Sequence, residues 1–204
     1  MNLRPTVCLM SLMLVSGCAP MFSYARMLPP GHIEVTPSVS PSFVSGGGET
    51  AHAWNDFGVR VQAGLSDRVG WGAGYNRTVL TVDDAANGFG FNTVAFGPKV
   101  SLMPERLAVA VPVTFSFGEG TDSDHWLVNP TLLMTLPVNE RVDFNPAVRL
   151  LVPICDDCKT AIAFHAGFGL RAGRRLILRP EAAMVVTPGE DAVTWTLGLG
   201  TSLR

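Results

Sequence analysis

The residues that could carry chemistry are few, and the cysteines are the most informative of them. Two of the four cysteines, Cys155 and Cys158, enclose a two-residue acidic spacer. In an exported protein such a pair forms a disulfide at a loop tip. A redox-active pair needs a helix N-terminus to stabilise its thiolate, and a metal site needs more soft ligands than one pair supplies. The spacing predicts a Cys155–Cys158 disulfide, with free thiols or a metal as alternatives, and we assign no metal site.

The histidines offer only weak candidates for catalysis. Asp122, Asp124 and His125 share one short polar segment, but this combination is common in loops. His165 stands alone among small residues, and no serine pairs legibly with it. The glycine run 46–48 lacks the lysine and the helix of a phosphate-binding loop. We therefore predict no enzyme, no catalytic residues and no non-covalent cofactor.

The composition favours a β-protein of unusual apolarity. Only 16% of the 204 residues are charged, 21 are glycine, and the mean hydropathy is +0.27. A typical soluble domain is about 25% charged. The net charge of −2 excludes a broadly basic nucleic-acid binder. No apolar run approaches the roughly 18 residues of a membrane-spanning helix. Two classes remain: an apolar soluble β-protein, and a β-barrel in a membrane.

The N-terminus predicts export. One base, Arg4, precedes the apolar run Val7–Val15, which has the length of a secretory signal core. The next residues, Val15-Ser16-Gly17-Cys18, resemble the lipobox of bacterial lipoproteins. That resemblance implies cleavage before Cys18 and fatty acids such as palmitate on its thiol and amine. We predict a signal peptide over 1–17 and a lipidated tether over 18–31; the alternative is a plain secretory signal with an incidental Cys18.

From residue 32 onward apolar and polar residues alternate with the period of two that is typical of β-strands. Val109, Val111 and Val113, for example, alternate with Ala110 and Pro112. Each segment is about 11 residues long, enough for a tilted strand to cross a bilayer. We predict ten strands, over 32–44, 56–66, 69–80, 91–102, 106–117, 126–136, 141–154, 160–171, 175–186 and 192–203.

The connections between these strands alternate in length and charge. Four short turns lie at 66–68, 104–106, 139–141 and 172–174, and longer loops lie at 45–55, 81–90, 118–125, 155–159 and 187–191. The loops, with residue 56 at the edge of the first, carry eleven acids and one base, Lys159. The acids are Glu49, Asp56, Asp83, Asp84, Glu119, Asp122, Asp124, Asp156, Asp157, Glu190 and Asp191. The bases at the short-turn end are Arg68, Arg106, Arg141, Arg171, Arg174, Arg175 and Arg204.

Short turns on one side and longer loops on the other resemble the small outer-membrane β-barrel proteins of Gram-negative bacteria, over residues 32–204. The resemblance implies a closed antiparallel barrel with extracellular loops, and with short turns and both termini in the periplasm. Aromatic residues near both ends of the predicted strands, such as Trp126 and Trp71, fit the interfacial girdles of such barrels. Two features depart from the pattern: the chain ends on Arg204, and the predicted strands carry prolines, among them Pro37, Pro41, Pro98, Pro112, Pro130, Pro146 and Pro180. The prolines predict bulges or shortened strands, and eight strands are the alternative to ten.

Alternation places a set of polar residues on the inner face of the predicted barrel. Buried charges must be paired or hydrated, so we predict a salt-bridge network that fills the lumen. A narrow, hydrated pore of mixed charge is the alternative. The set is Glu34, Arg60, Gln62, Lys99, Asp143, Asn145, Arg149, His165, Arg179 and Glu181.

These patterns together predict a lipid-anchored outer-membrane β-barrel with a structural role or a passive pore for small solutes. The alternative is a periplasmic, lipid-tethered β-sandwich that acts as a binding or assembly module. A barrel-type outer-membrane hydrolase is a remote alternative. The expected partners are outer-membrane lipids. The acidic loops either form a soluble surface or bind lipopolysaccharide through divalent cations. No nucleic acid is expected.

Overall fold

The computed structural model describes residues 21–81, 89–118, 125–155, 158–173 and 175–204. The predicted signal peptide over 1–17 and the predicted lipidation site Cys18 lie outside these residues. The described residues form one antiparallel sheet of 13 strands. The strands are β1 (Ile33–Gly46), β2 (Glu49–Gly64), β3 (Val69–Leu80), β4 (Gly90–Met103), β5 (Leu107–Ala110), β6 (Val113–Phe117), β7 (His125–Val128), β8 (Thr131–Met134), β9 (Leu136–Pro137), β10 (Val142–Pro153), β11 (Ala161–Arg171), β12 (Leu176–Val186) and β13 (Val193–Leu203).

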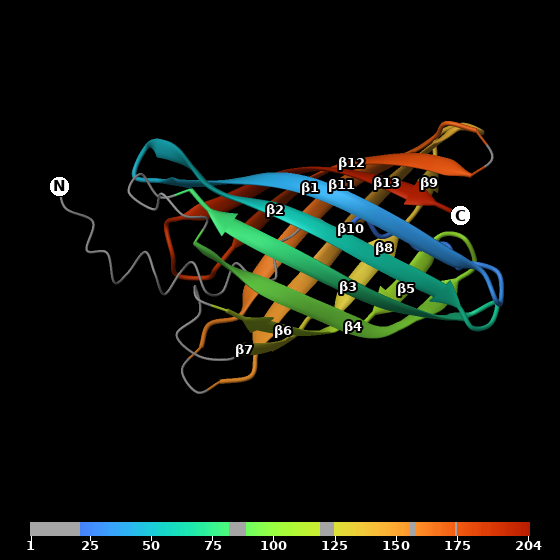
Figure 1. Cartoon of the computed structure of the whole chain (residues 1–204), viewed down its shortest axis with the longest axis horizontal. Helices are drawn as coiled ribbons and strands as arrows, with labels where there is room; N and C mark the ends of the chain where they lie inside the picture. The colour runs from blue at the N-terminus through green and yellow to red at the C-terminus, as the bar shows by residue number, and fades with distance from the viewer. Residues whose placement is uncertain (1–20, 82–88, 119–124, 156–157, 174) are drawn as a thin grey trace.

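The sheet closes on itself because β1 pairs with both β2 and the last strand, β13. The consecutive pieces β5 and β6 share one position in the wall, and so do β7, β8 and β9. The described residues therefore make a closed barrel of ten strand positions, which Figure 1 shows from the side. This confirms the predicted fold, and it excludes both the eight-strand alternative and the β-sandwich. Among the described residues no helix is long and apolar enough to cross a membrane.

Two of the prolines in the predicted strands divide a strand of the wall into separate pieces. Pro112 separates β5 from β6, and Pro130 separates β7 from β8, because proline has no N–H to donate to the ladder. Pro98 and Pro146, in contrast, lie inside continuous strands. The one register shift between β1 and β2 falls at Ser42 and Phe43. Pro37, Pro41 and Pro180 also lie inside continuous strands, so most of the prolines shorten no strand.

The first predicted loop, 45–55, is not a loop, and this prediction was wrong. Strands β1 and β2 pair as far as Gly46 and Glu49, and the turn between them is Gly47–Gly48. Both glycines have positive φ, 62° and 85°, the backbone conformation that tight hairpin turns require. Asp56 consequently lies within β2, where it is 3% exposed. It accepts hydrogen bonds from Trp54, Asn76 and Thr78.

The distribution of apolar and polar side chains is the reverse of that in a soluble protein. Large apolar side chains cover the outside; Val39, Trp71, Phe164 and Leu197 are 42–55% exposed. Charged and hydroxyl side chains point inward and are buried. The lumen also holds small apolar clusters, one around Leu127 and Leu151 near the loop end. The alternation of each strand therefore sorts the sequence into an apolar outer face and a polar inner face.

The N-terminal residues also lie inside the barrel. Met21, Phe22, Tyr24, Ala25 and Leu28 are 0–4% exposed. We call Met21–Leu28 the luminal segment. It runs along the inside toward the short-turn end and enters β1 there (Figure 1). The sequence predicts a lipidated tether over 18–31. Its described part begins with Met21–Leu28, whose apolar and aromatic side chains are buried in the lumen.

Candidate functional site in the barrel lumen

The ten polar residues that alternation assigns to the inner face all point into the lumen. Nine of them are buried and Arg60 is half-buried. Their partners, however, are different from those the sequence suggests. Asp143 and Arg149 face inward but do not form an ion pair in the described contacts, and neither do Arg179 and Glu181. Most of the partners come from the luminal segment and from strands that are distant in sequence.

Glu34 on β1 is the centre of a cluster at the short-turn end. Its carboxylate is fully buried and lies 3.2 Å from the guanidinium of Arg179 on β12. Arg204, directly after β13, also donates to this carboxylate. The hydroxyl of Tyr24 donates to it at 3.0 Å and accepts from Arg204 at 2.9 Å. One carboxylate therefore joins two strands, the C-terminus and the luminal segment.

The ring of Tyr24 lies among three cations. The distances to its centroid are 4.1 Å for Arg179, 4.7 Å for Lys99 and 5.4 Å for Arg204. Such contacts are attractive because the face of the ring is negative, and they strengthen when water is excluded. Tyr24 belongs to the luminal segment and not to a membrane-spanning strand. Burial first, and then the Glu34 carboxylate, raise the pKa of its phenol to about 12, so the phenol stays protonated and donates.

Glu181 on β12 holds the beginning of the luminal segment. The backbone N–H groups of Met21 and Phe22 donate to its two carboxylate oxygens at 2.7 and 2.8 Å. Phe22 has φ of 47°, and successive N–H groups in such a turn converge on an anion. Nδ1 of His165 on β11 lies 2.8 Å from the same carboxylate. His165 therefore has a structural role, because its ring contacts Glu181.

Two further wall residues hold the middle of the segment. The ammonium of Lys99 on β4 donates to the carbonyl oxygens of Tyr24 and Arg26 at 3.2 and 2.8 Å. Asp143 on β10 pairs with Arg26 at 2.7 Å and with Arg171 at 2.9 Å.

Next to these ion pairs, a hydroxyl of the wall holds the backbone of the segment. The N–H of Ala25 donates to Thr135 at 2.9 Å, and Thr135 donates to Asn145. The wall therefore binds both backbone and side chains of the luminal segment.

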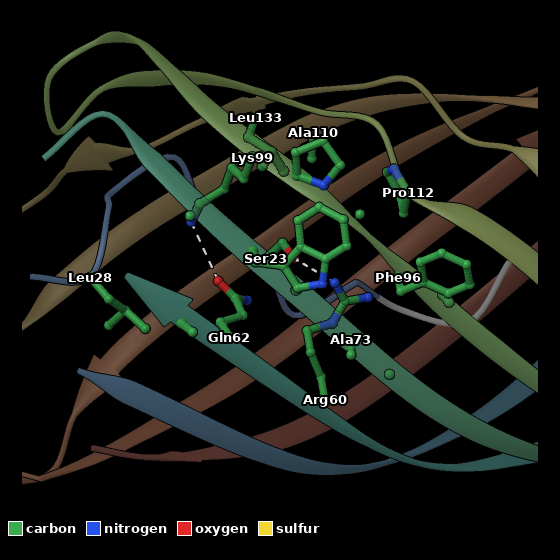
Figure 2. A pocket seen from close by; sticks show the side chains of 18 of the residues that line it. Ser23, Leu28, Arg60, Gln62, Ala73, Phe96, Lys99, Ala110, Pro112 and Leu133 are labelled. Carbon is green, nitrogen blue, oxygen red and sulfur yellow. Dashed lines mark hydrogen bonds between the residues drawn. The ribbon is translucent and has the colours of Figure 1, made fainter. Parts of the chain in front are cut away.

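Two cavities adjoin the segment. One of about 40 Å³ is lined by Ser23, Leu28, Arg60 and Lys99, among others. Figure 2 shows Arg60 directed at Ser23 and Lys99 directed at Gln62 across this space. The other cavity, of about 70 Å³, lies nearer the loop end.

We call this second space the Arg60–Arg149 cavity. Among the described residues that line it, the charged ones are these two arginines, and none carries a carboxylate. The others are Phe22, Ser38, Ser40, Gly58, Val59, Gly74, Tyr75, Asn76, Thr93, Ala95, Pro112, Thr114 and Asn129.

The contributors to this site that sequence reasoning missed include Tyr24, Arg26, Arg171 and Arg204. The first two sit in a range that looks like a linker, and the last two sit at strand ends that look like interfacial bases. Glycines on the inner face are the sequence feature that could have indicated the luminal segment. A Cβ on Gly200 would lie 2.9 Å from the ring of Phe22, and one on Gly64 would meet the carbonyl oxygen of Leu28. Inward glycines at these positions leave space for a chain inside the barrel.

The remaining predicted sites lie at the loop end. A disulfide joins Cys155 and Cys158. Asp122 and Asp124 lie outside the described residues, as do the loop acids Asp83, Asp84, Glu119, Asp156 and Asp157. Within the described residues no group of three or more His, Cys, Asp and Glu side chains could hold a metal ion. The lumen is therefore the candidate site that the structure supports.

No protein-family model and no curated protein matches the chain. Several solved structures do match it. The translocator domain of the autotransporter NalP from Neisseria meningitidis is 9% identical, with 98% of each chain covered and a TM-score of 0.55. The protease OmpT from Escherichia coli is 10% identical, with 85% of this chain and 95% of that chain covered and a TM-score of 0.48.

Ail, the attachment invasion locus protein of Yersinia pestis, is 12% identical, with 85% of this chain and 98% of that chain covered and a TM-score of 0.42. Similarity at these identities concerns the fold alone. The fold is that of an outer-membrane β-barrel, like the NalP translocator domain.

Proposed function

We propose that the protein is an outer-membrane β-barrel protein with a structural role, and that its lumen is closed in the resting state. The observation that carries this proposal is the inverted polarity of the wall. Exposed Trp71, Trp126, Phe164 and Leu199 belong to a continuous apolar outer face. Monomeric soluble proteins rarely expose apolar patches beyond a few hundred square ångströms. A bilayer solvates such a face, and a closed barrel satisfies every backbone group within it.

The aromatic residues support the same placement. Phe115 stacks on Phe117 and packs against Trp126 near the loop end. Phe144 packs against Phe168 near the short-turn end. Aromatic clusters at two levels of the wall match the two interfaces of a bilayer. We propose that the loop end is extracellular and that the short turns face the periplasm.

The luminal segment favours the structural role over an open, passive pore. Its residues occupy the short-turn half and the middle of the lumen, and they are held by contacts to β1, β4, β10 and β12. The two cavities beside it, of about 40 and 70 Å³, have room for little more than a few water molecules. A solute would have to displace the segment in order to cross.

Lipid anchoring at Cys18 is a separate part of the proposal, supported by the lipobox-like sequence. Cys18 lies outside the described residues, so the anchor is proposed from the sequence pattern alone.

The proposed partners are outer-membrane lipids around the apolar face. Lipopolysaccharide bridged by divalent cations remains a proposal for the acidic loops, now without Asp56, which is buried inside β2. No catalytic residue is assigned to the chain. A hydrolase site that uses Asp122 and Asp124 would lie outside the described residues.

The test uses the outer-membrane fraction of cells that make a Cys18→Ala protein behind a plain secretory signal. A closed barrel resists cold detergent and shifts in gel mobility only after heating. We expect membrane-bound protein with such a shift, because the apolar wall needs no lipid anchor. Soluble periplasmic protein without a shift would refute the proposal. Metabolic labelling with palmitate, compared between Cys18→Ala and the unmodified chain, tests the anchor independently.

A further inference from the structure

The outer face of the barrel carries polar side chains on one side of the molecule. From β5 to β13 the outward strand positions that the structure describes are apolar, with Thr201 as the exception. On β1–β4, in contrast, outward polar residues gather toward the loop end. They are Ser45, Thr50, His52, Asn55, Tyr75, Arg77 and Asn92. We call Asn55, Tyr75, Arg77 and Asn92 the outer polar patch, because they lie on neighbouring strands of the wall.

Arg77 brings a positive charge to this patch. It pairs with Phe57 on β2 and with Asn92 on β4. Phe57 is 51% exposed, and residues paired across strands point to the same face. The other charged residues of β1–β4, apart from Glu49 beside the hairpin turn, lie on the inner face. They are Glu34, Asp56, Arg60 and Lys99. Within the described part of these strands, Arg77 is therefore the base that faces the bilayer.

The neighbours of Arg77 supply further polar groups. The hydroxyl of Tyr75 donates to Oδ1 of Asn92 at 2.7 Å, so the donor that this amide presents to a ligand is its N–H2 group. On the other side, Asn55 is a diagonal neighbour of Arg77, and its Oδ1 lies 3.2 Å from Nε2 of His52. A guanidinium has five N–H donors, so Arg77 can contact groups of its own chain and also bind an anion.

The patch lies near the loop end of the wall. Arg77 is three residues from the end of β3 at Leu80. Asn92 pairs with Phe117, which stacks on Phe115 in the aromatic cluster at that end. Aromatic residues of this kind mark the interface between membrane and water, where the phosphate groups of lipids lie. In the proposed orientation this interface belongs to the outer leaflet, and its phosphates are those of lipopolysaccharide.

We propose that the outer polar patch binds a phosphate group of a lipopolysaccharide molecule, with Arg77 as the main donor and Asn92 beside it. The proposal rests on the proposed outer-membrane barrel and its orientation. It assigns the lipid a site on the wall itself, which needs no divalent cation at the loops. Arginine is suited to this ligand because its planar fork matches two phosphate oxygens. The acyl chains of the same molecule would lie against the apolar side chains below, such as Val59.

The experiment titrates lipid A, labelled on an acyl chain, against the full-length barrel in a zwitterionic detergent. A chelator is present, so that no divalent cation can bridge lipid and loops. The probes are lipid A with its phosphates and the same lipid after their removal. We expect the phosphorylated lipid to bind at least about 5-fold more tightly, which is the effect of one arginine near an anionic lipid. Inorganic phosphate in excess should not displace it, because the acyl chains contribute to binding on the wall.

Variants of the two ends of β3 test the position of the site. Arg77→Gln should weaken binding of the phosphorylated lipid about 5-fold and remove the difference between the two lipids. Arg68→Gln is the matched control, since it removes an exposed arginine directly before the other end of the same strand. An equal loss in the control would show a general attraction to bases and would overturn the assignment to the outer polar patch.

The outcomes separate this proposal from the proposed function. A heat-modifiable, membrane-bound barrel that binds both lipids equally overturns the phosphate site and leaves the barrel proposal standing. Displacement of lipid A by inorganic phosphate overturns the lipid as the occupant. Should Arg77→Gln not fold, Arg77→Lys keeps the charge but loses the planar fork. That variant must then show a smaller preference for the phosphorylated lipid than the unmodified chain, or the proposal fails.

Discussion

The two halves of the lumen have the same kind of wall but are filled differently. In the short-turn half, Arg179 and Arg204 pair with Glu34, and Tyr24 of the luminal segment presents its ring to Lys99, Arg179 and Arg204. In the loop half, the space beyond Phe22 remains a cavity of about 70 Å³. Arg60 and Arg149 line it together with hydroxyl and amide groups, and Thr93, for example, bonds to Ser116 across β4 and β6. The difference shows that the wall alone does not pack its own interior.

This contrast explains the mixture of residues on the inner face. The charged side chains that face the luminal segment contact its carbonyl oxygens, its N–H groups or the ring of Tyr24. Where no segment reaches, hydroxyl groups bond to one another, as Ser42 does with Thr196, and the carboxylate of Asp56 accepts hydrogen bonds from Asn76 and Thr78. A variant that disturbs the contacts in one half of the lumen should therefore leave those in the other half unchanged.

The largest effect is expected for Glu34→Ala. The substitution removes the fully buried carboxylate and leaves Arg179 and Tyr24 without their partner. Breaking a buried pair by removing one member costs about 3–5 kcal/mol. Urea unfolding of the detergent-solubilised barrel should show a loss of this size. The control is Glu105→Ala, whose side chain is 64% exposed, and which should cost at most about 1 kcal/mol; equal losses would contradict the central role of Glu34.

A smaller effect is expected for Glu181→Gln, which keeps the shape of the side chain but removes its charge. The two N–H groups of Met21 and Phe22 and the imidazole of His165 then lose a charged acceptor. Hydrogen bonds to charged groups contribute about 1.5–3 kcal/mol each. The attachment of the segment should weaken, while the wall stays folded.

The readout is the maleimide labelling rate of a Ser23→Cys probe in the Cys18→Ala background. We expect Glu181→Gln to raise that rate about 10-fold, which corresponds to about 1.4 kcal/mol. Glu190→Gln, at the loop end, should leave it unchanged. Equal rates in all three proteins would show that the start of the segment does not depend on Glu181.

A steric variant sharpens the same comparison. A Cβ at Gly200 would lie 2.9 Å from the ring of Phe22, whereas one at Gly72 has its nearest neighbour at 3.9 Å. Overpacking costs about 1–3 kcal/mol, so Gly200→Ala should increase labelling of the Ser23→Cys probe and Gly72→Ala should not. Increased labelling in neither variant would mean that Phe22 moves aside freely.

The smallest effect near neutrality concerns pH. The raised pKa of Tyr24, about 12, means that the stability from its hydrogen bond is fully present below its ordinary pKa of 10.0. That stability is lost as the pH rises from 10 through 12. Labelling of the Ser23→Cys probe should be constant with pH, after correction for thiol ionisation, below pH 10 and rise above it. Tyr24→Phe should abolish the rise; a rise that persists in this variant would assign it to another group.

The strands could be predicted from the sequence because their alternation is local. Every predicted segment overlaps the strand found at that position. The inward direction of Arg149, His165 and Glu181 follows from the alternation of side chains between the two faces of a strand. The hairpin at Gly47–Gly48 was mistaken for part of a loop, because the polar residues that follow it resemble a surface segment. That some prolines would break strands could be predicted from the missing N–H group. That Pro112 and Pro130 are the ones that do so depends on the strands beside them.

The partners of the inner residues could not be predicted from the sequence. Glu34 and Arg204 are 170 residues apart, and only closure of β13 onto β1 brings them together. Met21 and Glu181 are 160 residues apart, and they meet because the chain enters the barrel before its first strand. By itself the sequence determined which face of each strand is polar, since side chains alternate along any extended chain. The tertiary structure alone decided which charges pair and that the lumen is filled, because both depend on closing a ring around a segment that has no periodic pattern of its own.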